Sequence, residues 1–73
     1  GLAVERLAGL QKNYLGLYPE RGEQARAHFA EAERAARQGR PEAALAGYEL
    51  ALGLDPLDFA AHERYWPLAR ERR

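Results

Sequence analysis

The chain has 73 residues, among them 15 Ala, 11 Leu, 10 Arg and 9 Glu, and its 11 basic and 11 acidic side chains give a net charge of zero. It contains no Cys, Met, Ser, Thr or Ile. These absences exclude the usual hydroxyl and thiol nucleophiles, disulfides, thiolate zinc sites and Walker-type phosphate loops. A neutral chain also lacks the broad positive field that nucleic acid or an anionic membrane attracts, so neither is an expected partner.

The sequence gives a few expectations about location and source. No apolar run approaches the roughly 20 residues of a membrane span, and no stretch has the pattern of a signal peptide, so we expect a cytoplasmic protein. The chain begins with Gly1 rather than Met, and we expect a domain of a larger protein. The preference for Arg over Lys indicates a GC-rich, thermophilic bacterial source, although codon bias alone produces the same composition.

Four helices are expected, because Ala, Leu, Arg and Glu are strong helix formers and β-branched residues are nearly absent. The first helix covers residues 2–17 and ends before Pro19. Its apolar residues recur every three or four positions and so share one face, which comprises Ala3, Leu7, Leu10, Tyr14 and Leu17.

The second helix is predicted over residues 21–38 and ends at Gly39, a residue that readily adopts the left-handed conformation. The third covers residues 41–54 and begins at Pro41, whose missing N–H is not needed at a first helical position. The apolar face of the second helix comprises Ala25, Phe29, Ala32 and Ala36. That of the third comprises Ala44, Leu45, Tyr48, Ala51 and Leu52.

The fourth helix is predicted over residues 58–71, with Asp58 as its N-cap. Pro67 is expected to kink or break this helix, because proline cannot donate a hydrogen bond to the carbonyl of Glu63. The Arg-rich end beyond it is expected to be frayed. Since the connections between helices are short, successive helices should pack antiparallel in a single all-α domain.

The sequence contains an internal repeat. Residues 15–19 (LGLYP) match residues 52–56 (LGLDP) at an offset of 37, and the Ala-His pair at 27–28 matches the one at 61–62 at an offset of 34. The first helix therefore resembles the third, the second resembles the fourth, and the repeated unit is a helical hairpin. Chance similarity between Ala-, Leu- and Gly-rich helices is the alternative interpretation.

Residues 25–58 resemble a tetratricopeptide repeat (TPR) in the small, aromatic and turn positions of that family. The matching positions are Ala32, Gly39, Ala44, Tyr48, Ala51, Leu52 and Pro56. The resemblance implies a right-handed stack of about four helices, a non-catalytic scaffold without a cofactor, and a groove lined by one face of each first helix. The groove positions that it implies here are Arg26, Phe29, Glu33, Ala36 and Arg37.

Tyr65 and Trp66 lie in the last helix and have two interpretations. They cover the end of the core, or they are exposed anchors for a partner, since Trp and Tyr are frequent in binding hot spots. His28 and His62 lie in different helices, and neither helix contains a His-x-x-x-His or Glu-x-x-His pair. We therefore expect no metal site and no catalytic residues.

The predicted function is protein–protein interaction of TPR type, with another protein or a peptide segment as the partner. Two alternatives stay open. The chain could be a homo-oligomerisation domain, since its zero net charge does not oppose self-association into a homodimer. It could also be the helical effector domain of a bacterial transcriptional regulator, and a DNA-binding domain in the parent chain would distinguish that case.

Overall fold

The computed structural model describes residues 2–72 and confirms the all-α prediction. The elements are α1 (Leu2–Leu17), α2 (Pro19–Arg37), α3 (Pro41–Leu54) and α4 (Phe59–Arg72). The predicted helix ends differ from these by at most two residues. No helix among the described residues combines the length and the apolar composition needed to cross a membrane.

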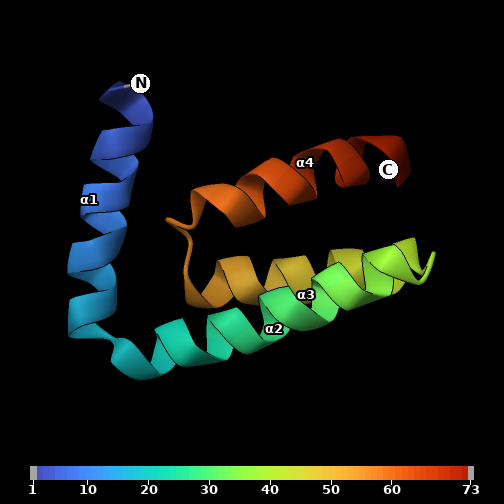
Figure 1. The fold of residues 1–73 in the computed structure, drawn as a ribbon, viewed down its shortest axis with the longest axis horizontal. Coiled ribbons are helices and arrows are strands. Elements are labelled where there is room, and N and C mark those ends of the chain that lie inside the picture. The colour runs from blue at the N-terminus through green and yellow to red at the C-terminus, as the bar shows by residue number, and fades with distance from the viewer. Residues whose placement is uncertain (1, 73) are drawn as a thin grey trace.

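Helices α2 and α3 form an antiparallel hairpin (Figure 1). Gly39 makes the turn with a positive φ of 71°, which glycine adopts without strain. The next residue, Arg40, donates its backbone N–H to the carbonyl of Ala35 at 2.9 Å, which closes the end of α2. Pro41 then begins α3 at the position predicted for it.

Helix α3 lies between α2 and α4 (Figure 1) and supplies four of the nine buried hydrophobic residues among those described. Its buried residues are Ala44, Leu45, Tyr48 and Ala51. From α4, Ala61 and Ala69 are buried, and Tyr65 and Leu68 pack against the core while half-buried. Because most buried residues are alanines, the helices approach closely and the core is small.

Helix α1 does not pack along α2, and the expectation of an antiparallel first hairpin is wrong in this respect. Figure 1 shows α1 turned across the end of the other three helices, and none of its described residues is buried. A single residue, Tyr18, joins α1 to α2, and it accepts a hydrogen bond from the backbone N–H of Gly22 at 3.3 Å. A link this short bends the chain but leaves no length for α1 to fold back.

Two side chains hold α1 against the connection between α3 and α4. Gln11 donates from Nε2 to Oδ2 of the buried Asp55 at 2.7 Å, and the Tyr14 hydroxyl donates to the carbonyl of Leu54 at 2.7 Å. These contacts hold the start of the α3–α4 connection. At its other end, Asp58 caps α4 as predicted by accepting the N–H of Ala61 at 3.2 Å.

A kink or a break was predicted at Pro67, and the break is wrong, because α4 continues through Pro67 to Arg72. Pro67 costs the helix one hydrogen bond. Leu68 and Ala69, directly after it, pack towards the core, and this packing keeps the chain helical. Tertiary packing therefore decides the conformation of the C-terminal end of α4.

Candidate functional site

The α2 residues that were predicted to bind a partner differ in their exposure to solvent. Arg26, Ala36 and Arg37 are exposed. Phe29 is half-buried, with its ring centroid 5.7 Å from that of Tyr48. Glu33 contacts Arg64 of α4. The predicted α2 face therefore lies beside α4, and part of it is used to hold the two helices together.

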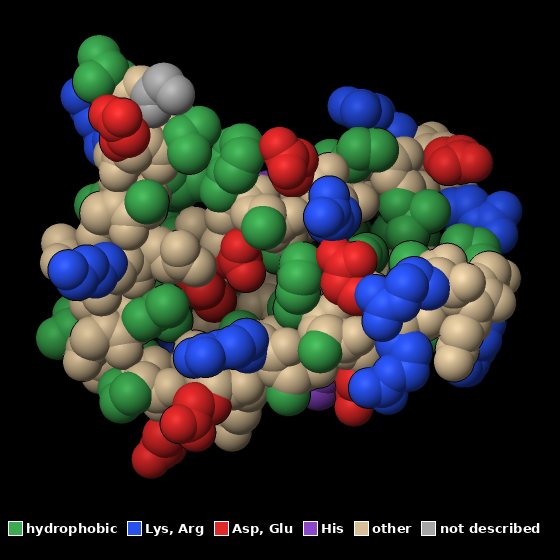
Figure 2. Space-filling view, viewed as in Figure 1, with side chains coloured by type: hydrophobic (Ala, Val, Ile, Leu, Met, Phe, Trp, Pro, Cys, Tyr) green, Lys and Arg blue, Asp and Glu red, His purple; other side chains and the backbone are tan. Residues whose placement is uncertain are grey.

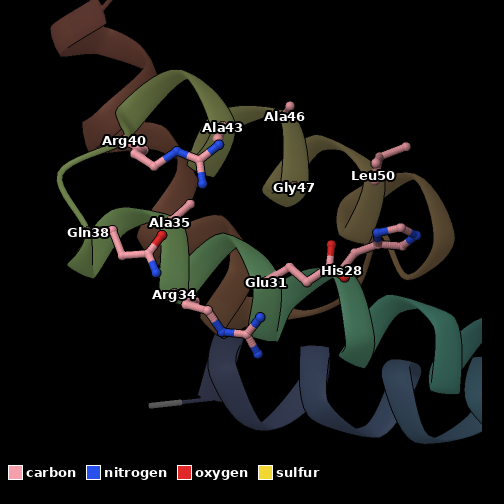
Figure 3. Close-up of a pocket in the computed structure, with 10 residues that line it drawn as sticks. All are labelled: His28, Glu31, Arg34, Ala35, Gln38, Arg40, Ala43, Ala46, Gly47 and Leu50. Atoms are coloured by element: carbon pink, nitrogen blue, oxygen red, sulfur yellow. The ribbon is translucent and has the colours of Figure 1, made fainter.

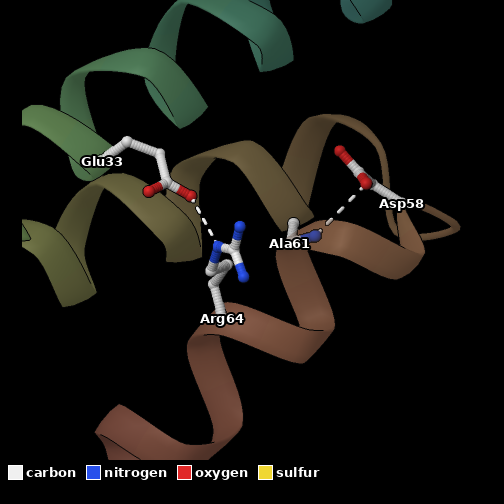
Figure 4. A network of polar contacts seen from close by, with 4 residues as sticks. All are labelled: Glu33, Asp58, Ala61 and Arg64. Carbon is white, nitrogen blue, oxygen red and sulfur yellow. Dashed lines mark hydrogen bonds and ion pairs between the residues drawn. The ribbon is translucent and has the colours of Figure 1, made fainter.

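Glu33 is the centre of this contact. Its Oε1 accepts a hydrogen bond from Nε of Arg64 at 3.0 Å, which joins α2 to α4 across 31 residues of sequence (Figure 4). Burial raises the pKa of Tyr48, and the charge of Glu33 and its hydrogen bond to Tyr48 raise it further, while Arg64 and Arg37 lower it. The Tyr48 hydroxyl is consequently kept neutral beside the carboxylate.

Tyr65 and Trp66 of α4 have different surroundings. Tyr65 packs against the core and donates from its hydroxyl to Oε2 of Glu49 at 2.8 Å. Trp66 is 52% exposed, with its ring centroid 5.0 Å from that of Tyr65. The indole Nε1 donates to Nδ1 of His62 at 3.1 Å. Tyr65 therefore covers the core, whereas much of the Trp66 ring faces outward.

His62 has hydrogen bonds on both ring nitrogens. Its Nε2 lies 2.7 Å from the carbonyl of Pro56, and its Nδ1 accepts from Trp66. This pattern requires the neutral tautomer with the proton on Nε2. Across residues 2–72, no three His, Cys, Asp or Glu side chains are grouped as metal ligands.

A groove runs along the side of the α2–α3 hairpin opposite to the Glu33–Arg64 contact. None of its lining residues belongs to α4 (Figure 3). We call it the hairpin groove, and its volume is about 390 Å³. The lining residues are His28, Glu31, Arg34, Ala35, Gln38, Arg40, Ala43, Ala46, Gly47 and Leu50. Small residues form its floor, and most of the polar side chains rise from α2 and from the turn after it.

The charges of the hairpin groove are unevenly distributed. Arg34, Gln38 and Arg40 stand near the turn, whereas His28 and Glu31 lie nearer the middle of α2 (Figure 3). Figure 2 shows Lys and Arg side chains gathered over the end of the molecule where α2 and α4 finish. Basic residues there interact favourably with the negative ends of both helix dipoles, and they make this end attractive to acidic groups.

This groove was not predicted from the sequence. The available signal was the second face of α2, where His28, Glu31, Arg34 and Gln38 recur at three- and four-residue spacing. That spacing is also typical of an ordinary solvated helix face. Only the packing of Gly47 against Ala32, which brings α3 alongside, distinguishes a groove from such a face.

Comparisons with protein-family models, with curated proteins and with solved structures give no match for this chain.

Proposed function

We propose that the chain is a protein–protein interaction module of TPR type, which binds an acidic amphipathic segment of another protein in the hairpin groove. The observation that carries the proposal is the groove itself, an open hollow of about 390 Å³ between two antiparallel helices. An open groove of this kind suits an extended or helical segment, which brings its own secondary structure to the contact.

The lining determines the chemistry of the partner. Ala43, Ala46 and Gly47 have little or no side chain, so a partner helix can approach the backbone of α3 closely. Leu50, which is 54% exposed, offers an apolar contact at the far end. Arg34 and Arg40 would then pair with carboxylates, and such charge-assisted contacts fix orientation as well as adding affinity.

The hairpin has features that the proposed module needs. Gly39 lies in the turn, and Ala32, Ala44 and Ala51 are buried. These are four of the seven positions at which the sequence resembles a TPR. An interaction module also accounts for a chain whose surface keeps large apolar side chains such as Trp66 exposed.

The test is a selection of displayed random peptides against the full chain, followed by titration of a selected peptide. We expect selected peptides to be acidic and amphipathic, and Arg34→Glu and Arg40→Glu to weaken binding about tenfold or more. Arg26→Glu is the matched control, because Arg26 is an exposed arginine on α2 that does not line the groove.

The same titration distinguishes the two faces of α2. If Arg26→Glu weakens binding and Arg34→Glu does not, the partner lies on the face beside α4, and the groove proposal is overturned. Failure to select any peptide that binds the folded chain would overturn the proposed function as a whole.

A further inference from the structure

Large apolar side chains are exposed mainly on two helices that lack a partner along one face. Within residues 2–72, the exposed ones are Leu2, Val4, Leu10, Leu17, Tyr18, Leu50, Phe59 and Trp66. Four of these belong to α1 and two to α4.

The internal repeat identifies the missing neighbour of α4. At the offset of 34 that relates α2 to α4, Phe59 corresponds to Ala25 and Trp66 to Ala32. Ala25 and Ala32 are 4% and 1% exposed, and Ala32 meets Gly47 of α3. Phe59 and Trp66 are 41% and 52% exposed, and within residues 2–72 no helix packs on α4 as α3 packs on α2.

The same repeat shows that α1 has the pattern of such a following helix. At the offset of 37 that relates α1 to α3, Leu10 corresponds to Gly47 and Leu17 to Leu54. Leu10 and Leu17 lie seven residues apart on one face of α1 and are 51% and 74% exposed. Of the two corresponding positions in α3, Gly47 packs directly against Ala32 of α2, so Leu10 stands at the position of that contact.

Helix α1 does not occupy this position within its own chain. Gln11 and Tyr14 hold it against the connection between α3 and α4, and Figure 1 shows it across the ends of the hairpin instead of alongside α4. In a second copy, α1 is held to its own α3–α4 connection in the same way, but that copy as a whole can approach the open face of α4.

We propose that two copies of the chain form a symmetric dimer in which α1 of each copy packs along the open face of α4 of the other. By the repeat register, Leu10 of one copy lies against Trp66 of the other, as Gly47 lies against Ala32 within the hairpin. The larger side chains hold these helix axes further apart, within the usual 8–10 Å. The contact is made twice, as twofold symmetry requires.

The exposed apolar side chains supply a large part of the area that such a dimer needs. Taking ordinary aromatic side-chain sizes, Phe59 and Trp66 leave on the order of 200 Å² uncovered in each copy. Leu10 and Leu17 leave a similar area. Together they supply about half of the roughly 800 Å² that each partner buries in a standard interface. Zero net charge removes long-range repulsion between copies.

The first test is molar mass by light scattering over a range of concentrations. We expect the native chain to dimerise, and Leu10→Glu and Trp66→Glu each to raise the dissociation constant about tenfold or more. Leu50→Glu is the matched control, since Leu50 is as exposed as Leu10 but lies in the hairpin groove. Circular dichroism verifies that each variant is helical. A native chain that stays monomeric, or a dimer disrupted only by Leu50→Glu, overturns the proposal.

A second test detects the contact directly by a disulfide. Since the native chain has no cysteine, an introduced pair has no other cysteine to react with in its own chain. Under mild oxidation, Leu10→Cys/Trp66→Cys should form a disulfide-linked dimer that reducing agent dissociates. The control Leu50→Cys/Trp66→Cys should not. A Leu10→Cys/Trp66→Cys chain that forms the bond only within a monomer would place α1 on its own α4 and overturn the proposal. Both tests are independent of the peptide titration, which concerns the hairpin groove.

Discussion

Gly47 of α3 lies directly against Ala32 of α2, at the centre of the hairpin. A Cβ atom added to Gly47 would lie 2.8 Å from the Ala32 Cβ, 3.2 Å from its Cα and 3.3 Å from its backbone nitrogen. Ala32 is 1% exposed, and its backbone is part of α2, so it cannot rotate aside. The separation of α2 and α3, and with it the floor of the hairpin groove, therefore depends on the missing side chain.

We predict that Gly47→Ala destabilises the protein by about 1–3 kcal/mol, the usual cost of overpacking. Alanine is the better helix former by up to about 1 kcal/mol, so the clash must exceed that gain. The measurement is the free energy of unfolding in urea. A more stable Gly47→Ala variant would contradict the close contact between the helices.

Two other glycines are controls for this prediction. At Gly22 an added Cβ would approach the flexible side chain of Leu15, with Cδ2 nearest at 2.8 Å. At Gly9 it would meet nothing within 4 Å. Gly9→Ala should therefore stabilise α1 by up to about 1 kcal/mol, and Gly22→Ala should lie between the other two variants.

The Glu33–Arg64 ion pair should contribute little to stability. The Arg64 side chain is 57% exposed and that of Glu33 is 24% exposed, so water screens much of the attraction. We predict a coupling energy of about 0.5–1 kcal/mol in a double-mutant cycle with Glu33→Gln and Arg64→Gln. The coupling should fall as salt is added. A coupling that salt leaves unchanged would indicate a hydrogen-bond role rather than a charge interaction.

The helices could be predicted from the sequence because their signals are local. Gly39 and Pro41 mark the turn between α2 and α3 by their backbone preferences, and both lie where predicted. The direction of α1 could not be predicted in the same way. Its apolar face indicates that it needs a partner but not which one, and the one-residue link at Tyr18 determined its path.

The candidate site was predictable only in part, for the same reason. Phe29 and Glu33 were placed on a common face of α2, and the structure brings both beside other helices. Which side of the hairpin α4 covers depends on tertiary packing, and periodicity along α2 does not contain that information. The hairpin groove, with Arg34 and Arg40, was missed because it lies on the side that α4 leaves open.

Replacing Pro67 should stabilise α4. The helix continues through Pro67 although proline cannot donate the hydrogen bond that the carbonyl of Glu63 would accept. Pro67→Ala restores that donor at an exposed position, and we predict a gain of about 1–3 kcal/mol in the free energy of unfolding. Pro19→Ala is the control, because Pro19 starts α2, where no N–H is needed, and it should gain little. An equal gain at both positions would contradict this explanation.

The stability of the protein should fall at alkaline pH through Tyr48. Burial raises the pKa of its hydroxyl, so the folded state favours the neutral form more than the unfolded chain does. The contribution of Tyr48 is therefore complete below its unfolded pKa of about 10 and is lost as the pH rises through the folded value. The free energy of unfolding, measured in urea between about pH 8 and pH 11, should decrease over the upper part of that range.

Tyr48→Phe separates this effect from the ionisation of the other tyrosines. Near neutral pH the variant should lose about 1 kcal/mol, the usual value of one hydrogen bond, because the hydroxyl no longer donates to Glu33. Above about pH 10 its stability should depend less steeply on pH than that of the native chain, since the buried ring has no proton to release. Tyr18→Phe, at an exposed position, should leave the slope unchanged. Equal slopes for the native chain and Tyr48→Phe would show that the unfolding does not involve ionisation of Tyr48.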